Sequence, residues 1–297
     1  MVAAAGPRRG RPRRAGDRRV TPRTAVITVV HGRHAHFETQ QAGLAQCLPG
    51  PHDRIVVAMA DPVIATLAGP DTLVVPCAAD TAALPLAHAR NLGARTALDR
   101  GADLLIFLDV DCIPGHDLIG RYLEAHLRVA RPALLCGPVT YLPPAPGGYP
   151  LDRLDELTDP HPARPTPPPG VLQPEPNHDL FWSLSFACSA DTWARLGGFC
   201  EDYVGYGGED TDVGATAAAQ RIPMMWVGGA HAYHQHHRVS DPPVEHVAAI
   251  VANARVFRRR WGRWPMTGWL DAFERDGLIV RREDQIEMTE RTVATHA

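Results

Sequence analysis

Residues 104–111 read Leu-Leu-Ile-Phe-Leu-Asp-Val-Asp, an apolar run that ends in two aspartates. A continuous run of large apolar residues is typical of a strand buried on both faces, as in a parallel sheet covered by helices. Ligands of such sheets bind beyond the carboxyl ends of the strands. The segment therefore predicts a buried strand that delivers Asp109 and Asp111 to a ligand-binding edge.

The chain on either side of this run alternates short apolar stretches with amphipathic ones. We expect strands at 25–30, 54–59, 72–77, 180–187 and 224–227, and helices at 85–99 and 209–220. This alternation predicts an α/β protein whose mostly parallel, Rossmann-like sheet is flanked by helices. Arg33 follows the first strand and could pair with a phosphate. Asp61 follows the second, where it could accept a hydrogen bond from a uracil ring or simply begin a turn.

The chain is long enough for one substantial core with appendages, because it has 297 residues and 45% hydrophobic composition. We expect a catalytic domain at 24–240 and a C-terminal extension at 241–297, where apolar residues recur at helical spacing. Between residues 142 and 176 lie 12 of the 28 prolines. The insertion at 142–178 is therefore expected to lack helices and central strands.

The first 23 residues form a separate, basic tail. Residues 1–23 contain eight arginines and one aspartate, a formal charge of +7 that leaves −10 for the rest of a chain whose total is −3. Because the tail is poor in apolar side chains, we expect it to be disordered, and either simply solvated or in weak peripheral contact with anionic lipid or nucleic acid.

Localisation and redox state follow from what the sequence lacks. No apolar run reaches the roughly 18 residues of a membrane span, and no secretory signal is visible, so we expect a cytoplasmic protein without a specific nucleic-acid partner. The six cysteines stand singly, without C-x-x-C spacing, and are expected as reduced thiols.

The paired aspartates Asp109 and Asp111 predict a metal site. Carboxylates placed side by side repel each other unless a cation lies close, and oxygen ligands that face a diphosphate suit Mn²⁺ or Mg²⁺. The alternative is that they only end a strand and cap the next helix. Residues 231–237 read His-Ala-Tyr-His-Gln-His-His and follow the strand expected at 224–227. Their imidazoles could complete the metal site, or could be solvated surface side chains.

Residues 205–212 read Gly-Tyr-Gly-Gly-Glu-Asp-Thr-Asp and predict a glycine turn that opens a helix. Glu209 and Asp210 would lie in the first helical turn, where anions are stabilised, and this alone could explain them. The functional alternative is that one of these carboxylates takes the proton of an acceptor hydroxyl as it attacks the anomeric carbon of a sugar.

Two segments, in this order, resemble known enzymes. Residues 107–114 and 198–212 are similar to the hallmark segments of the β-1,4-galactosyltransferase family. They also resemble the galactosyltransferase-like C-terminal region shared with polypeptide N-acetylgalactosaminyltransferases and bacterial family-two glycosyltransferases. The resemblance covers roughly 24–237. It implies a GT-A nucleotide-diphospho-sugar transferase fold and a metal-dependent, inverting transfer of a hexose from a nucleotide-diphosphate sugar, expected to be a UDP-sugar, to a hydroxyl acceptor.

The resemblance also implies ligands for the metal and the nucleotide. Asp111 falls on the residue that ligates Mn²⁺ or Mg²⁺, and Asp109 on the residue that faces the ribose side of the nucleotide. His234 falls on the metal-binding histidine of the family. His231 stands where animal members carry a weakly ligating methionine, which implies a stronger metal site.

Further roles are implied for the acceptor side and for a helix near the nucleotide. Asp210 falls on the catalytic base, and Glu209 beside it supports the acceptor site. Tyr206 replaces the lid tryptophan of the family and keeps an aromatic ring over the sugar. Arg90 and Asn91 match a helix that approaches the nucleotide.

Two other functions remain open at this stage. A nucleotidyltransferase also binds a nucleotide over an aspartate-rich metal site, although it would normally carry a glycine-rich basic loop after the first strand, of which residues 31–33 supply little. A non-catalytic nucleotide-sugar-binding module would keep the site without turnover. The presence of Glu209 and Asp210 argues against loss of the base.

Overall fold

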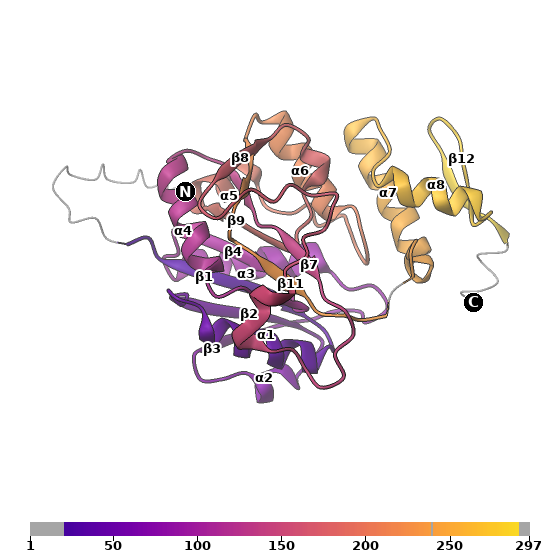
Figure 1. The fold of residues 1–297 in the computed structure, drawn as a ribbon. Coiled ribbons are helices and arrows are strands. Elements are labelled where there is room, and N and C mark those ends of the chain that lie inside the picture. Colours follow the sequence, from indigo (N-terminus) through magenta and orange to yellow (C-terminus); the bar gives the residue numbers. More distant parts are fainter. Residues whose placement is uncertain (1–20, 239, 291–297) are drawn as a thin grey trace, which may run out of the picture.

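The apolar run that ends in Asp109 and Asp111 lies at the centre of the molecule. Within residues 21–238 and 240–290, which the computed structural model describes, it forms β4 (Leu104–Leu108) in the middle of an eight-stranded sheet (Figure 1). The strand order is β3-β2-β1-β4-β9-β6-β10-β8, and β9 and β8 run opposite to their neighbours. The remaining strands of the sheet are β1 (Thr24–Val30), β2 (Asp53–Met59), β3 (Thr72–Cys77), β6 (Leu134–Cys136), β8 (Leu172–Glu175), β9 (Ser185–Ser189) and β10 (Met224–Val227). The predicted mostly parallel α/β sheet is confirmed.

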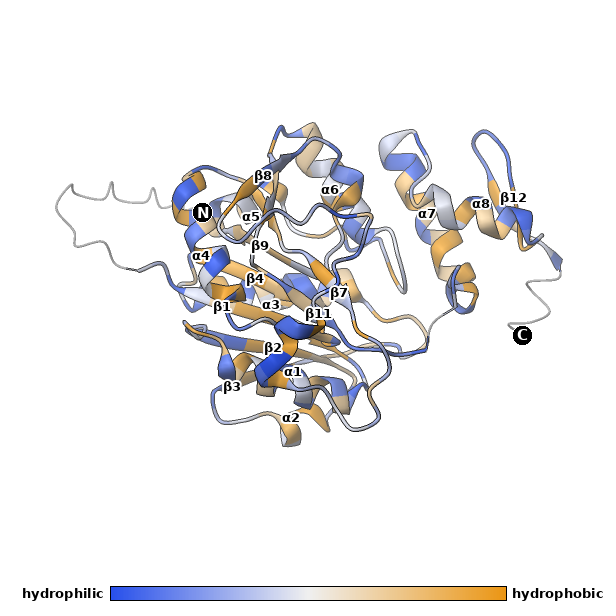
Figure 2. Cartoon of the chain, in the orientation of Figure 1, coloured by the Kyte–Doolittle hydropathy of each residue, from blue (hydrophilic) through white to orange (hydrophobic). Residues whose placement is uncertain are grey.

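Helices cover both faces of this sheet, which explains why β4 is apolar throughout. On one face Ile27 and Phe107 pack with α3, α5 and α6, and on the other Val26 and Ile106 pack with α1 and α4. Figure 2 shows the central strands coloured mostly as hydrophobic. The helices of this part of the chain are α1 (His34–Gln46), α2 (Ile64–Leu67), α3 (Leu86–Asp99), α4 (Leu118–Val129), α5 (Ala190–Leu196) and α6 (Glu209–Ala219).

A small sheet joins segments that are distant in sequence. It has the order β5-β11-β7 and consists of β5 (Cys112–Pro114), β7 (Val139–Tyr141) and β11 (Ala232–His234). β5 begins one residue after Asp111, and β11 pairs with it in antiparallel register, with His234 opposite Cys112. The first part of the histidine-rich segment, up to His234, is thereby fixed beside the loop that follows β4.

The proline-rich insertion at 142–178 is only partly irregular. It contains a 3-10 helix, η1 (Leu151–Leu157), and the edge strand β8. The expectation that it lacks helices is wrong, because η1 itself is free of proline and begins directly after Pro150. Pro174 is tolerated within β8 because this strand lies at the edge of the sheet.

The strand predicted at 180–187 starts later than expected. Residues up to Leu180 belong to a second 3-10 helix, η2 (His178–Leu180), and β9 begins only at Ser185. The side chain of Asn177 accepts a hydrogen bond from the backbone N–H of Asp179 and so caps η2. This local side-chain bond competes with an extended backbone.

The C-terminal extension has a small core of its own. Its buried apolar side chains include Ile250 and Phe273, and Phe257 connects it to the rest of the chain by packing on Tyr203 and Ala215. The predicted helix at its start is confirmed. The elements are η3 (Val244–His246), α7 (Val247–Trp261), α8 (Thr267–Arg275), β12 (Ile279–Arg281) and β13 (Ile286–Met288).

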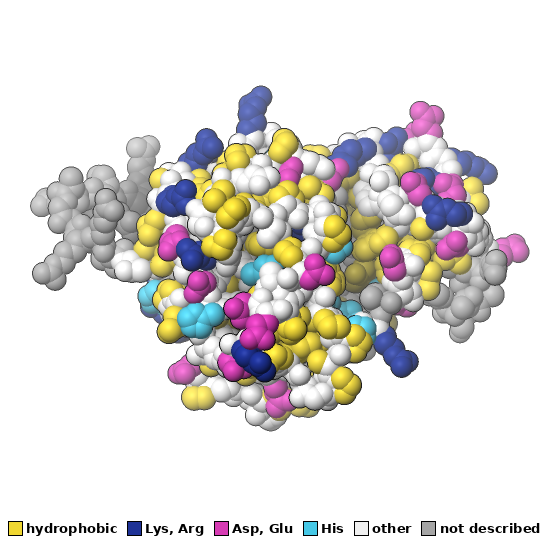
Figure 3. Space-filling model, viewed as in Figure 1, with side chains coloured by type: hydrophobic (Ala, Val, Ile, Leu, Met, Phe, Trp, Pro, Cys, Tyr) yellow, Lys and Arg dark blue, Asp and Glu magenta, His cyan; other side chains and the backbone are white. Residues whose placement is uncertain are grey.

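The basic tail predicted at 1–23 lies mostly outside the described residues. Its last residue, Arg23, is described and forms an ion pair with Asp53, with 2.7 Å between Nη2 and Oδ2. Within the described ranges, none of the helices has both the length and the apolar content to span a bilayer. On the face drawn in Figure 3, acidic and basic side chains are interspersed.

Candidate active site

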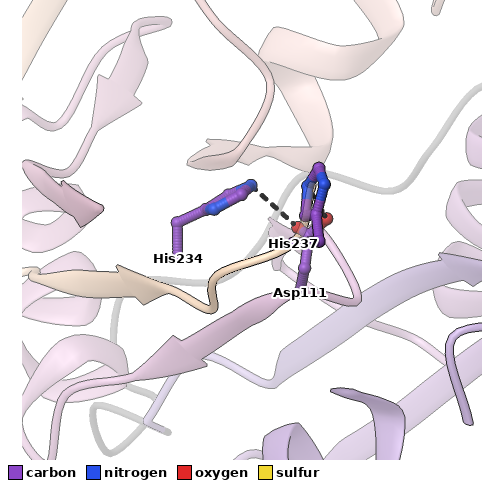
Figure 4. Close-up of side chains that lie close together, drawn as sticks. All are labelled: Asp111, His234 and His237. Atoms are coloured by element: carbon purple, nitrogen blue, oxygen red, sulfur yellow. Dashed lines mark ion pairs between the residues drawn. The ribbon is translucent and has the colours of Figure 1, made fainter. Parts of the chain in front are cut away.

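The small sheet places two histidines against Asp111. His234 Nε2 lies 3.5 Å from Asp111 Oδ1, and His237 Nε2 lies 3.5 Å from Asp111 Oδ2 (Figure 4). The backbone N–H of Gln235 donates to the carbonyl oxygen of Asp111 at 2.7 Å and ties the two segments together. The ligand atoms of the three side chains lie within 4.8 Å of one another. This cluster is the candidate metal site.

The ionisation of Asp111 and His234 suits metal binding. Burial raises the pKa of Asp111, but the hydrogen bond from His237 and the charges of His234 and Arg33 outweigh it and hold the pKa at about 2. Burial lowers the pKa of His234, which favours the neutral imidazole. An ionised carboxylate and neutral imidazoles are the forms that bind metals. Arg33 Nη1 lies 3.4 Å from Asp111 Oδ2, so its guanidinium lies beside the cluster, and its contact with a phosphate stays a prediction.

Gln40 of α1 holds the loop that carries the two aspartates. Its buried side-chain amide donates to the carbonyl oxygens of Asp109, at 2.6 Å, and Cys112, at 3.2 Å. Its Oε1 accepts from the hydroxyl of Thr28 at 3.1 Å. Gln40 was not a predicted site residue, since nothing in the surrounding sequence marks it.

Arg90 connects the two acidic segments of the site. Its Nη2 donates to Asp109 Oδ1 and its Nη1 to Glu209 Oε1, each at 3.0 Å, and the arginine is only 4% exposed. Burial raises the pKa of Asp109 to about 6, although the charge of Arg90 opposes the shift. Arg90 thus joins Asp109 and Glu209, which the sequence analysis assigned separately to the nucleotide and to the acceptor side.

The glycine turn delivers two carboxyls with different environments. Gly208 has φ +95° and caps α6, a conformation that side chains rarely adopt, so the turn requires glycine. Glu209 follows it, and its second oxygen, Oε2, is buried without a hydrogen-bond partner among the described residues. Burial, and next the charge of Glu209, raise the pKa of Asp210 to about 7. A carboxyl with a pKa near neutrality is suited to proton transfer.

His231 does not belong to the metal cluster of the described chain. Its Nε2 lies 2.7 Å from the hydroxyl of Thr140, and burial lowers its pKa to about 4. The cluster contains His237 where His231 was expected. The reason is that His231 directly precedes β11, in whose extended backbone successive side chains alternate, so His231 and His234 face opposite sides.

Asn91 also takes a place different from the expected one. Its side-chain amide donates to the carbonyl oxygen of Phe199 and to Glu201, and its oxygen accepts from the backbone N–H of Phe199. These bonds hold the turn before the glycine segment, so Asn91 supports the site from behind, while Arg90 on the same helix faces it.

Asp61 and Tyr206 contact neighbouring segments of the protein, Asp61 through hydrogen bonds and Tyr206 through ring stacking. Asp61 Oδ2 accepts from the backbone N–H of Gly32 at 2.7 Å and lies 2.9 Å from His34 Nε2, so it fixes the loop after β1. The ring of Tyr206 stacks on His246, at 4.4 Å between centroids, and on Trp269, at 5.8 Å. The predicted lid residue therefore packs against the C-terminal extension.

Asp212, the last acidic residue of the glycine segment, has a structural environment. It is 2% exposed and accepts hydrogen bonds from Tyr203, Arg260 and Trp261. This network joins α6 to α7. Nothing in the sequence pattern indicates it beyond the presence of these polar residues.

Two solved structures of known proteins superpose on this fold. GalNAc-T7, solved with UDP, GalNAc and Mn²⁺, superposes with a TM-score of 0.53 at 11% identity, over 87% of this chain and 58% of its own. The mannosyltransferase PcManGT from Pyrobaculum calidifontis, in complex with GDP-Man and Mn²⁺, gives 0.50 at 18% identity, over 83% and 67%. The chain has the GT-A glycosyltransferase fold.

Sequence comparison adds two matches to this GT-A chain. The family model of the N-terminal domain of galactosyltransferase matches residues 174–238, which include the glycine segment and the histidines of the candidate metal site. Validoxylamine A glucosyltransferases from two subspecies of Streptomyces hygroscopicus, jinggangensis and limoneus, are each 33% identical over 156 residues. The match covers 47% of this chain and 36% and 34% of those relatives, so the chain aligns with about a third of their length.

Proposed function

We propose that this chain is a divalent-metal-dependent, inverting glycosyltransferase that transfers a hexose from a nucleotide-diphosphate sugar to a hydroxyl acceptor. The observation that carries the proposal is the cluster of Asp111, His234 and His237 at the end of a GT-A central strand. The Arg90-linked pair of Asp109 and Glu209 lies beside it. The likeness to metal-containing glycosyltransferase structures supports the same function.

The residues of the cluster fit a divalent transition metal. Opposite ligands of an octahedral ion lie about 4.2 Å apart, at about 2.1 Å each from the ion. Ligand atoms within 4.8 Å of one another need only a small contraction to reach that geometry. Two imidazoles beside one carboxylate favour Mn²⁺ over Mg²⁺, which prefers oxygen ligands. When bound, the metal would neutralise the charge of the departing nucleoside diphosphate.

The remaining residues of the site bind substrate and move the proton. Arg33 supplies a cation for the diphosphate, and Arg90 holds Asp109 towards the nucleotide. Asp210 accepts the proton of the acceptor hydroxyl, because its raised pKa places it near neutrality. The free Oε2 of Glu209 accepts a hydrogen bond from the acceptor. A single base-assisted attack from the face opposite the diphosphate inverts the anomeric configuration.

The sugar donor is proposed from the relatives. The match to a galactosyltransferase family model and the likeness to GalNAc-T7 support a UDP-sugar, and the curated relatives are glucosyltransferases by name, which makes UDP-glucose the first donor to test. PcManGT was solved with GDP-Man, so GDP-mannose serves as the matched comparison.

The proposal is tested by measuring nucleoside diphosphate release from UDP-glucose, UDP-galactose and GDP-mannose, with Mn²⁺ or with EDTA, over a panel of hydroxyl acceptors. We expect Mn²⁺-dependent release from a UDP-sugar and a product whose anomeric configuration, read by NMR, is inverted. Pyrophosphate release from a nucleoside triphosphate would instead identify a nucleotidyltransferase, and donor binding without turnover a binding module. A retained anomeric configuration would remove the proposed single displacement.

A further inference from the structure

Arg164, in the proline-rich insertion, is buried without a partner. It is 4% exposed, and its Nε, Nη1 and Nη2 atoms all lack a hydrogen bond within the described chain. The guanidinium carbon lies over two indole rings, 5.2 Å from the centroid of Trp182 and 4.7 Å from that of Trp226. Stacking of this kind uses the face of the guanidinium and leaves its in-plane N–H donors free.

Within the described part of the chain, no carboxylate forms an ion pair or a hydrogen bond with Arg164. The groups whose charges would act on it most strongly are thiols and phenols, Cys136, Tyr122, Tyr141 and Cys112. Burial raises the pKa of each of these groups, so they are neutral at physiological pH. Leaving a buried charge unpaired is destabilising, and a fold that keeps one needs a reason outside its own packing.

The position of Arg164 connects it to the metal cluster. The Trp182 ring lies 5.3 Å from that of His161, which lies 5.4 Å from Tyr141, and Tyr141 stacks on the metal-site His234 at 4.6 Å. A series of contacts between aromatic rings thus links Arg164 to the candidate metal site.

The loop that carries Arg164 is anchored at both ends. The backbone N–H of His161 donates to the carbonyl oxygen of Val139 at 2.9 Å, and that of Gly170 donates to the carbonyl oxygen of Gly228 at 3.0 Å. Between them, the backbone N–H of Arg164 itself donates to the carbonyl oxygen of His161 at 3.1 Å, so these bonds fix the backbone around the guanidinium.

We propose that Arg164 pairs with a carboxylate or phosphate group on a substrate that binds beside the metal cluster. The planar fork of the guanidinium matches both groups, and pairing satisfies the donors that the fold leaves free. This anion is additional to the nucleotide diphosphate, which lies at Asp111 and Arg33. The inference rests on the proposed function for the location of the substrate, and it adds that either the sugar donor or the acceptor is anionic.

The test compares Arg164→Met with wild type by calorimetric binding and thermal unfolding of the full chain with Mn²⁺. UDP-glucose and UDP-glucuronate differ in a carboxylate on the sugar and test the donor as its source. Inorganic phosphate, titrated in the presence of saturating UDP and Mn²⁺, tests an acceptor-borne anion. Arg153→Met is the matched control, because Arg153 lies in the same insertion but is 61% exposed.

If the donor carries the anion, wild type should bind UDP-glucuronate about tenfold more tightly than UDP-glucose, an effect typical of one charged hydrogen-bonding partner. If the acceptor carries it, wild type should bind phosphate. In either case Arg164→Met should lose this binding preference. Affinity for UDP-glucose and the behaviour of Arg153→Met should stay unchanged. Ligand-free Arg164→Met should unfold at the same or a higher temperature, because an unpaired buried charge has been removed.

Two results would overturn the inference. One is a lower unfolding temperature of Arg164→Met with unchanged anion affinity, which would make the arginine a packing residue. The other is that wild type and Arg164→Met bind UDP-glucuronate and phosphate with equal affinity. Should Arg164→Met fail to fold, Arg164→Lys, which keeps the charge without the fork, should lose the anion preference. Loss of Mn²⁺-dependent UDP-glucose binding in wild type would instead count against the proposed function.

Discussion

At the scale of single residues, the ionisation of Asp210 should control the rate of transfer. Burial and the charge of Glu209 raise its pKa to about 7, and a base acts only when ionised. Turnover should therefore rise with pH between about 5 and 8 and level off above. Asp210→Asn should lower kcat by a factor on the order of a hundred and flatten this profile. A wild-type profile without a rising limb in this range would contradict the assignment.

The same substitution provides a stability control. Because the folded protein raises the pKa of Asp210 above the value of an exposed aspartate, it favours the protonated carboxyl, and this contribution is present at low pH and lost as pH rises through about 7. The amide that Asp210→Asn introduces stays neutral, so this variant should raise the unfolding temperature more at a pH of about 8 than at about 5. A loss of stability at both pH values would mean that the rate effect comes from misfolding.

His237 and His231 form a matched pair for the metal assignment. Since His237 lies 3.5 Å from Asp111, His237→Ala should raise the Mn²⁺ concentration needed for half-maximal activity by about tenfold or more. His231→Ala should leave that concentration unchanged, but cost about 1–2 kcal/mol in the free energy of unfolding, because Thr140 loses its buried partner. Metal titrations of the two variants check this, and the opposite pattern would restore His231 as a ligand.

The sequence motifs predicted which types of residue form the site. They did not predict which of the histidines faces Asp111. Asp109, Asp111 and Glu209 stand in segments whose composition and spacing were informative. Which histidine faces Asp111 depends on where β11 ends and on its register with β5, and these are set by tertiary pairing. The alternation of side chains in a strand was a signal against grouping His231 with His234, three residues apart.

At the scale of secondary-structure elements, Asp212 joins α6 to α7. It accepts from Tyr203, Arg260 and Trp261, and it is 2% exposed. Asp212→Ala should destabilise the protein by about 3–5 kcal/mol, since it leaves several buried donors unpaired. Chemical denaturation measures this, and Asp202→Ala on the exposed turn nearby serves as control. An effect on the Mn²⁺ requirement of a folded Asp212→Ala variant would argue instead for a role at the metal.

Elements with strong apolar patterns were predicted almost to the residue. The strands at 72–77 and 224–227 agree with β3 and β10: β10 is buried throughout, and β3, at the edge of the sheet, is a short apolar run. The start of β9 was misplaced, since the side chain of Asn177 nucleates a 3-10 turn within an apolar stretch. The small sheet was not predicted, because its strands are short and pair over long sequence distances.

At the scale of the whole molecule, the two largest hydrophobic cores lie on the two faces of the central sheet, and neither contains Asp111, His234 or His237. Removal of the metal should therefore abolish transfer without unfolding the chain. Circular dichroism in EDTA should match that of the untreated protein, while activity disappears and returns on addition of Mn²⁺ at a lower concentration than of Mg²⁺. Unfolding in EDTA would assign the metal a structural role.

The central claim is that Asp111, with His234 and His237, holds the metal that binds the nucleotide diphosphate. The most direct measurement is calorimetric titration of UDP into wild type and Asp111→Ala, each with and without Mn²⁺, since it needs no knowledge of the acceptor. We predict that Mn²⁺ tightens UDP binding to wild type by about tenfold or more and has no effect on Asp111→Ala, which should still unfold cooperatively. Equal UDP affinity of wild type with and without Mn²⁺, or an undiminished Mn²⁺ effect in Asp111→Ala, would contradict the account.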